Sequence, residues 1–88
     1  MWFVYVLQHN TTIEIYIGKT NDLKRRITEH NHGQQTSTKR KSGEWLFLYA
    51  EIYKNKQFAD QRESRLKQHG RAKQELLKRI GKDPLTRN

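Results

Sequence analysis

Residues 2–18, WFVYVLQHNTTIEIYIG, decide the fold. The first part, Trp2–Leu7, is rich in β-branched and aromatic side chains and predicts a buried strand. After a polar, turn-like stretch at 9–12, isoleucine alternates with other residues over 13–17, which is the period of a strand. Two strands around a short turn predict a β-hairpin, and we expect its second strand to end at Gly18.

Helical signals follow the hairpin. Asn21 is a good N-cap, and Asp22 would then lie in the first turn, where the helix dipole favours a carboxylate. We expect this helix to run to about His30. The remaining predicted elements are a third strand and two helices separated by a glycine, at 45–53, 58–69 and 71–80.

The order ββαβαα predicts an α/β (α+β) fold, with a small, largely antiparallel three-stranded sheet flanked by helices. With 88 residues the chain is expected to form one domain over 1–82, followed by a tail at 83–88. It has no cysteine, which excludes disulfides and thiolate zinc sites. No apolar run approaches the roughly 18 residues of a membrane span, and we expect a cytoplasmic protein that does not bind membranes.

The charge points to a polyanionic partner. Eighteen basic residues against nine acidic ones give a net charge of +9 and a pI near 10.1. The bases gather outside the predicted strands, with seven over 19–41 and eleven over 54–88. Such a distribution favours nucleic acid as the partner, and the alternative is a basic surface that only improves solubility.

The first predicted helix carries two candidate functional side chains. At about 100° per residue, Arg26 and His30 fall on the flank of its apolar face, one turn apart. A guanidinium beside a sheet can clamp a phosphate through two parallel hydrogen bonds. The alternative is that Arg26 pairs with Glu29 or Asp22 and that His30 is an ordinary surface residue.

The second predicted helix carries a candidate metal ligand. Glu63 is flanked by Ala59 and Leu66 and so lies at the edge of an apolar stripe. A carboxylate there is costly to bury unless it is paired or holds a metal ion. The alternative is an ion pair with Arg62 or Lys67, which are both near in sequence.

Two tyrosines and a lysine of the hairpin are further candidates. Tyr16 points away from the face of its flanking isoleucines, toward a side where a helix or a substrate can lie. Lys19 follows Gly18 just past the expected end of the strand, where ligand-binding groups often gather. The alternatives are that Tyr5 and Tyr16 are core aromatics with satisfied hydroxyls and that Lys19 is only solvated.

These residues occur in the order and at the spacing of the GIY-YIG nuclease superfamily, which the sequence resembles. The first motif corresponds to Phe3-Val4-Tyr5, with Phe3 in place of glycine, and the second is intact as Tyr16-Ile17-Gly18. Arg26 stands ten residues after the tyrosine of the second motif, and His30 follows four residues later. The stretch 59–67 is similar to the family's helix that bears the metal-binding glutamate, here Glu63.

The resemblance covers about residues 2–80 and is strongest to short, single-domain bacterial proteins. These are similar to the incision domain of the nucleotide-excision repair nuclease and to homing endonucleases, so a role in DNA repair is one expectation. Many members have an asparagine after the glutamate helix, and the corresponding region here, 71–75, offers none.

The resemblance implies a metal-dependent endonuclease acting on phosphodiester bonds. Glu63 would hold one divalent ion, Mg²⁺ or Mn²⁺, and Arg26 would stabilise the charge of the transition state. Tyr5 or Tyr16 would orient the attacking water, with an activating cation that Lys19 could supply. His30 could assist as a base or as a phosphate contact, and the sequence leaves open which of these groups takes the proton.

The remaining positive charge is expected to follow a nucleic-acid backbone, with DNA favoured over RNA and little sequence preference. The main alternative is a binding module that keeps the fold but does not cut, and a third possibility is a domain that depends on a protein partner. The candidate backbone contacts are Lys39, Arg40, Lys41, Arg65, Lys67, Arg71 and Lys73.

Overall fold

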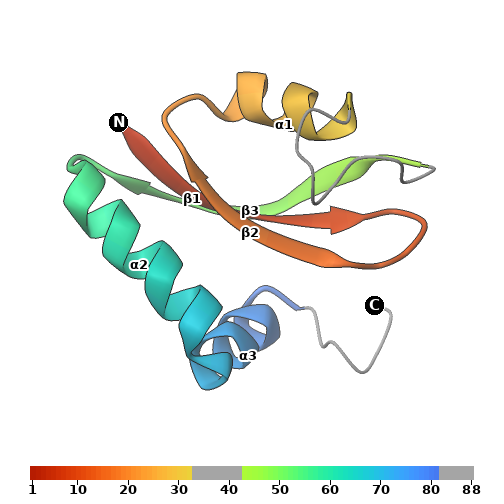
Figure 1. Ribbon diagram of the computed structural model, residues 1–88. Helices are drawn as coiled ribbons and strands as arrows, with labels where there is room; N and C mark the ends of the chain where they lie inside the picture. Colours follow the sequence, from red (N-terminus) through yellow and green to blue (C-terminus); the bar gives the residue numbers. More distant parts are fainter. Residues whose placement is uncertain (33–42, 82–88) are drawn as a thin grey trace.

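The computed structural model describes residues 1–32 and 43–81. Its elements follow the order ββαβαα, which confirms the predicted fold class (Figure 1). The strands are β1 (Trp2–His9), β2 (Ile15–Thr20) and β3 (Trp45–Tyr53), and the helices are α1 (Leu23–Asn31), α2 (Lys56–Gln68) and α3 (Gly70–Arg79).

The sheet has the strand order β2-β1-β3, and both pairings are antiparallel. The hairpin between β1 and β2 closes at His9, whose backbone N–H donates to the carbonyl of Glu14 at 2.9 Å. The buried imidazole of His9 also holds the turn, because its Nδ1 accepts the backbone N–H groups of Thr11 and Thr12, each at 3.2 Å.

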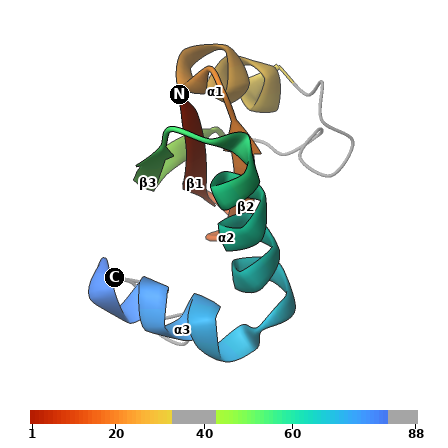
Figure 2. The same ribbon diagram turned by 90° about the vertical axis from the view of Figure 1, so that its left-hand side faces the viewer.

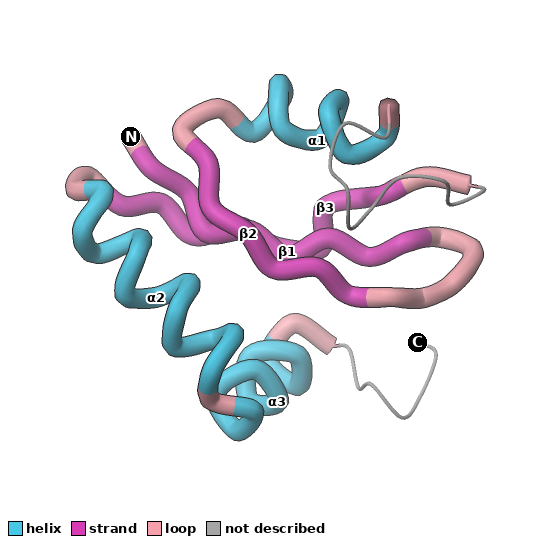
Figure 3. Tube along the Cα trace, viewed as in Figure 1, coloured by secondary structure: helices cyan, strands magenta, loops and turns pink. Residues whose placement is uncertain are grey.

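Helices cover both faces of the sheet, with α1 on one side and α2 and α3 on the other (Figures 2 and 3). Side chains of β1 therefore alternate between two cores. Toward α2 and α3 lies the aliphatic core, which consists of Val4, Val6, Ile17, Ala59, Leu66, Leu76 and Leu77. Toward α1 lies the aromatic cluster, in which Tyr5, Leu7 and Trp45 are buried and Tyr16, Leu23 and Ile27 pack against them.

A bulge in β3 changes which residues face each core. Val6 pairs with Tyr49 but Leu7 pairs with Phe47, so Leu48 is an extra residue in β3. Phe47 consequently lies against the ring of Tyr5, whereas Tyr49 packs with the aliphatic core. Strict alternation would have placed residues 47 and 49 on the same face.

The bounds of β2 differ from the prediction. The strand begins at Ile15 because Ile13 adopts a positive φ of 66° and belongs to the turn. It also continues through Gly18, which pairs with Tyr5 in the ladder, and ends at Thr20. Lys19 therefore lies within the strand rather than past its end.

The predicted cap of α1 is wrong by one residue. Asp22, rather than Asn21, is the N-cap, because its backbone is extended and its carboxylate accepts the backbone N–H of Arg25 at 3.0 Å. The later helices each begin earlier than expected, at Lys56 and Gly70. The sequence also predicts a basic loop over 32–43; nearly all of it and the predicted tail, 83–88, lie outside the described residues, so the interpretation of both stays a prediction.

Candidate active site

The hydroxyl of Tyr5 is the centre of a hydrogen-bonded group between the sheet and α1. Arg26 donates from Nε to the phenol oxygen at 3.0 Å, and the Nε2 atom of His30 lies 3.0 Å from the same oxygen. Arg26 also donates from Nη1 to Glu29 at 2.9 Å. The predicted pairing of Arg26 with Glu29 therefore exists, but it leaves Nε free to hold the tyrosine.

Tyr5 and His30 are sealed from solvent, with exposed fractions of 0% and 1%. Burial raises the pKa of Tyr5 to about 12, although the hydrogen bond from Arg26 opposes the rise. Burial also lowers the pKa of His30 to about 4, and the positive charge of Arg26 adds to this effect. Both side chains are consequently neutral near pH 7, and a neutral His30 can accept the phenol proton of Tyr5 while the phenol oxygen accepts from Arg26.

Gly18 is the residue that admits Tyr5 to this position. A Cβ atom built on Gly18 would lie 2.4 Å from the hydroxyl oxygen of Tyr5 and 3.1 Å from a ring carbon of Tyr16. Any other residue would push the phenol away from Arg26 and His30. The glycine of the second motif is thus required by the close approach of the Tyr5 ring, and no positive φ is involved.

Tyr16 lies beside this group and is only partly buried. Its ring centroid is 4.7 Å from that of His30 and 6.4 Å from that of Tyr5. The ammonium of Lys67, on α2, lies 5.8 Å from the centroid of the same ring. Tyr16 therefore connects the aromatic cluster to a cation from the opposite helix.

Glu63 reaches the edge of the site from α2. Its carboxylate is 3.2 Å from the ammonium of Lys67 and 3.8 Å from that of Lys19, and its side chain is 20% exposed. Lys19 also hydrogen-bonds Asp60, which is the main cause of its raised pKa. The negative charge of Glu63 adds slightly to the rise in the pKa of Tyr5, which burial dominates.

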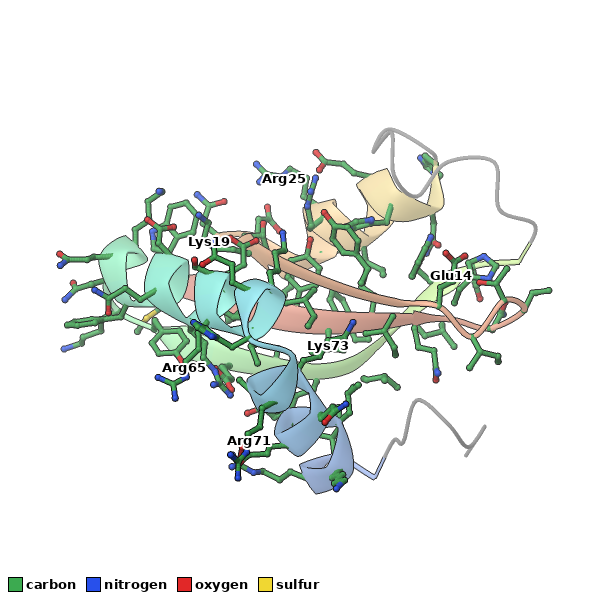
Figure 4. All side chains as sticks on the ribbon, turned by 60° about the horizontal axis from the view of Figure 1, so that its bottom comes forward. Glu14, Lys19, Arg25, Arg65, Arg71 and Lys73 are labelled. Carbon is green, nitrogen blue, oxygen red and sulfur yellow. The ribbon has the colours of Figure 1, made fainter. Side chains whose placement is uncertain are left out.

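The structure brings together six of the predicted site residues and separates others from them. The group comprises Tyr5, Tyr16, Lys19, Arg26, His30 and Glu63, drawn from β1, β2, α1 and α2. Lys67 adjoins it, whereas Arg65 lies on the other side of α2 from Lys19, and Arg71 and Lys73 are on α3 (Figure 4). The predicted backbone contacts Lys39, Arg40 and Lys41 lie outside the described residues.

The sequence interpretation missed Asp60, Lys56 and Trp45. Asp60 lies one turn before Glu63 and takes hydrogen bonds from Lys19 and Lys56, and its i, i+3 spacing to Glu63 could have indicated a shared partner. Trp45 is 3% exposed and its ring packs on those of Tyr16 and His30. No sequence signal links this tryptophan to the site, because the contact depends on the register of β3.

The fold and these contacts define a class: a small α+β domain that gathers phenols, a guanidinium and a carboxylate around an antiparallel sheet. The family model described as the GIY-YIG catalytic domain matches residues 1–76. The chain belongs to this family.

Relatives support the assignment. The chain is 32% identical to a UPF0213 protein of Vibrio campbellii over 76 residues, covering 86% of this chain and 72% of the relative. It is 35% identical to a UPF0213 protein of Halobacterium salinarum, covering 88% and 99%. The solution NMR structure of a UPF0213 protein from Bacillus halodurans is similar, with a TM-score of 0.56 and 27% identity over 99% of this chain and 93% of that one.

Proposed function

We propose that the protein is an endonuclease that hydrolyses phosphodiester bonds of nucleic acid, with DNA as the preferred substrate, and that it depends on one divalent ion. The observation that carries the proposal is a continuous series of contacts: Arg26 hydrogen-bonds Tyr5, the Tyr5 ring lies beside that of Tyr16, and Lys67 contacts both Tyr16 and Glu63. A guanidinium and partly exposed phenol and carboxylate groups, lined by ammonium groups, suit a phosphate backbone and the chemistry of its cleavage.

Glu63 is the group that fits the metal. Within the described ranges, no cluster of three or more His, Cys, Asp or Glu side chains could hold an ion. A single, partly exposed carboxylate suits Mg²⁺ or Mn²⁺, since Mg²⁺ is often bound by one or two carboxylates and keeps several waters. When bound there, the ion would offset charge on the leaving oxygen.

Two ammonium groups compete for the same carboxylate. Lys19 and Lys67 both contact Glu63, and each has another neighbour, Asp60 for Lys19 and the Tyr16 ring for Lys67. These neighbours allow each lysine to turn from Glu63 and remain stabilised. Asp60 would thereby keep Lys19 close to the site without blocking the carboxylate.

Burial distinguishes the roles of the two phenols. Tyr5 is sealed, and its pKa of about 12 makes it a poor base at neutral pH. Tyr16 is partly exposed and lies beside Lys67, so we assign the orientation of the attacking water to Tyr16. Tyr5 and His30 would then act as positioning residues that fix the direction of the Arg26 guanidinium. We therefore assign the role of the activating cation, which the sequence suggested for Lys19, to Lys67, whose ammonium lies beside the Tyr16 ring.

The central test is a cleavage panel with branched, nicked and single-stranded DNA and with RNA, in Mg²⁺ or Mn²⁺. We expect Glu63→Ala to abolish cleavage and Arg26→Ala to reduce it about 10²- to 10³-fold. Glu14→Ala is the matched control, because Glu14 is an exposed acid in the turn between β1 and β2, away from Lys19 and Arg71 (Figure 4). Cleavage that survives Glu63→Ala would contradict the assigned metal ligand.

A second candidate function is binding without cleavage. The observation that favours it is the sealing of Tyr5 and His30, which leaves fewer groups in reach of a substrate. Tight, salt-sensitive binding by the unaltered chain with no turnover in any metal would support this candidate. Turnover that appears only when a cellular protein is added would instead indicate a partner-dependent enzyme.

The place of the protein in the cell stays a prediction. Among the described residues, no helix combines the length and the apolar composition needed to cross a bilayer. A cytoplasmic nuclease acting in DNA repair is our expectation, and fractionation of cells that produce the tagged protein would test the location.

A further inference from the structure

The basic residues of α2 lie on two sides of the helix. Residues two apart on a helix are separated by about 200°, so Glu63 and Arg65 point in nearly opposite directions. Glu63 and Lys67 face β2 and Lys19, whereas Figure 4 shows Arg65 on the other side of α2 from Lys19. A strand bound at the candidate active site therefore cannot contact Arg65 by a direct path along one face.

A hollow of about 550 Å³ opens on this second side of α2. Phe58 is 51% exposed and lines it, together with Arg65 and His69. Arg62 also lines the hollow, but its guanidinium is held by two hydrogen-bonded oxygens of Glu51 at 2.9 and 3.0 Å. None of the described residues that line the hollow is acidic.

Arg65 is the available cation of this surface. It makes no ion pair with any residue of 1–32 or 43–81, in contrast to Lys19, Arg26 and Lys67. It also lines an adjoining hollow of about 280 Å³ with His69, Arg71 and the acidic Glu75. Arg71 is 92% exposed, and its ion pair with Glu75 spans 3.8 Å, so both guanidinium groups can meet an anion from solvent.

We propose that the surface formed by Phe58, Arg65, His69 and Arg71 is a second binding site for single-stranded nucleic acid. Exposed rings beside exposed guanidinium groups match the chemistry of such a strand, because bases stack on the rings and phosphates bind the cations. A duplex would hide its base faces and leave Phe58 unused. None of the site residues Tyr5, Tyr16, Arg26, His30 and Glu63 lines the hollow.

One chain would then hold two segments of nucleic acid, one at the candidate active site and one across α2. The second site does not depend on cleavage, since it shares no residue with the candidate active site. A substrate with a single-stranded arm next to a duplex would engage both sites and bind more tightly than either segment alone.

The test measures binding without metal, so that it stands apart from nuclease activity. Fluorescence anisotropy in EDTA would compare a labelled 20-nucleotide oligo(dT) with a 20-base-pair duplex, using the full chain and the variants Phe58→Ala, Arg65→Gln and both together. Phe58 and Arg65 are both exposed, and circular dichroism would verify that each variant folds. Lys24→Gln is the matched control, because Lys24 is exposed on α1.

We expect the double variant to bind oligo(dT) at least about tenfold more weakly than the unaltered chain. Its affinity for the duplex, and the affinity of Lys24→Gln for oligo(dT), should each change by less than about twofold. NMR shifts on adding oligo(dT) should include the amides of Phe58, Arg65 and His69. Equal weakening in Lys24→Gln, or shifts confined to the neighbourhood of Tyr16 and Glu63, would overturn the second site. Displacement of oligo(dT) by an equal concentration of poly-glutamate would also overturn it, by identifying a surface for acidic polypeptides.

The two proposals fail in different ways. If the chain binds oligo(dT) through Phe58 and Arg65 but cuts no substrate, only the proposed endonuclease activity is contradicted. If the chain cuts at a rate that depends on Glu63, but the Phe58→Ala, Arg65→Gln double variant binds oligo(dT) as well as the unaltered chain does, only the proposed second site is contradicted.

Discussion

The two faces of the sheet bury different kinds of side chain. The face toward α2 and α3 buries aliphatic side chains such as Val4, Val6 and Leu66, which make no hydrogen bonds with their side chains. The face toward α1 buries Tyr5 and His30 and joins them through polar atoms. The same strand, β1, supplies both faces through alternate residues. One face can therefore be optimised for stability while the other holds functional groups in fixed directions.

Matched leucine truncations on the two faces should show the largest contrast. Leu66→Ala removes a side chain that is 1% exposed in the aliphatic core, and we expect a loss of about 2–5 kcal/mol in the free energy of unfolding. Leu23→Ala removes the same atoms from a partly buried site beside α1, and we expect about half that loss or less. Urea unfolding monitored by circular dichroism measures both, and equal losses would show that the faces share the stabilisation.

The polar face should carry the pH dependence. The pKa of His30 is about 4 in the folded protein and near 6.5 when unfolded. Between about pH 6.5 and pH 4 the imidazole of His30 is therefore mostly protonated in the unfolded chain and mostly neutral in the folded chain. Stability is full above pH 6.5, declines as pH falls, and levels off below about pH 4, with a total loss on the order of 3 kcal/mol.

The measurement is the free energy of unfolding between pH 7 and pH 4, compared with His30→Asn. The variant should lack this part of the decline even if it is less stable throughout. His32→Asn is the control, because His32 is exposed two residues further on, at the C-cap of the same helix. A decline that persists in His30→Asn would assign it to another group.

Two glycine substitutions should have opposite signs. Gly18→Ala places a methyl group 2.4 Å from the Tyr5 hydroxyl oxygen, and we expect a loss of about 1–3 kcal/mol and displacement of the Tyr5 ring. Gly70→Ala meets no atom within 4 Å at the start of α3, and we expect a gain of about 0.4–1 kcal/mol. Thermal unfolding of both variants measures the difference. A neutral Gly18→Ala would mean that the sheet can yield without moving the phenol.

Sequence reasoning succeeded where a local pattern decides the structure. The alternation of the hairpin and the apolar spacing of α2 and α3 predicted the element order, and the helix geometry placed Arg26 and His30 on one flank of α1. The position of Glu63 at the edge of the aliphatic core also followed from its neighbours at i−4 and i+3.

Long-range register set what the sequence could not predict. The burial of His30 depends on Trp45 from β3, and the side of the sheet that Phe47 faces depends on a bulge at Leu48. The sequence predicts that β2 ends at Gly18 and that Lys19 follows it, but Gly18 pairs with Tyr5 and Lys19 with Val4, so the strand continues. The catalytic roles of these residues stay predictions.

The smallest expected effect concerns the cap of α1, which decides how firmly the polar face is held. Asp22→Ala removes the carboxylate that accepts the backbone N–H of Arg25, and we expect a loss of about 1 kcal/mol. Asn21→Ala should change stability by a few tenths at most, since its side chain only accepts an exposed contact from Arg25. A larger loss of stability in Asn21→Ala than in Asp22→Ala would show that Asn21 is the N-cap.

Because α1 carries Arg26 and His30, fraying of its first turn should reach the candidate site before it reaches the aliphatic core. Hydrogen exchange in Asp22→Ala should therefore accelerate along α1 and leave the amides of Val4, Val6 and Leu66 protected. Acceleration spread evenly over both faces would mean that the sheet couples them, and that the polar face cannot loosen without unfolding the whole domain.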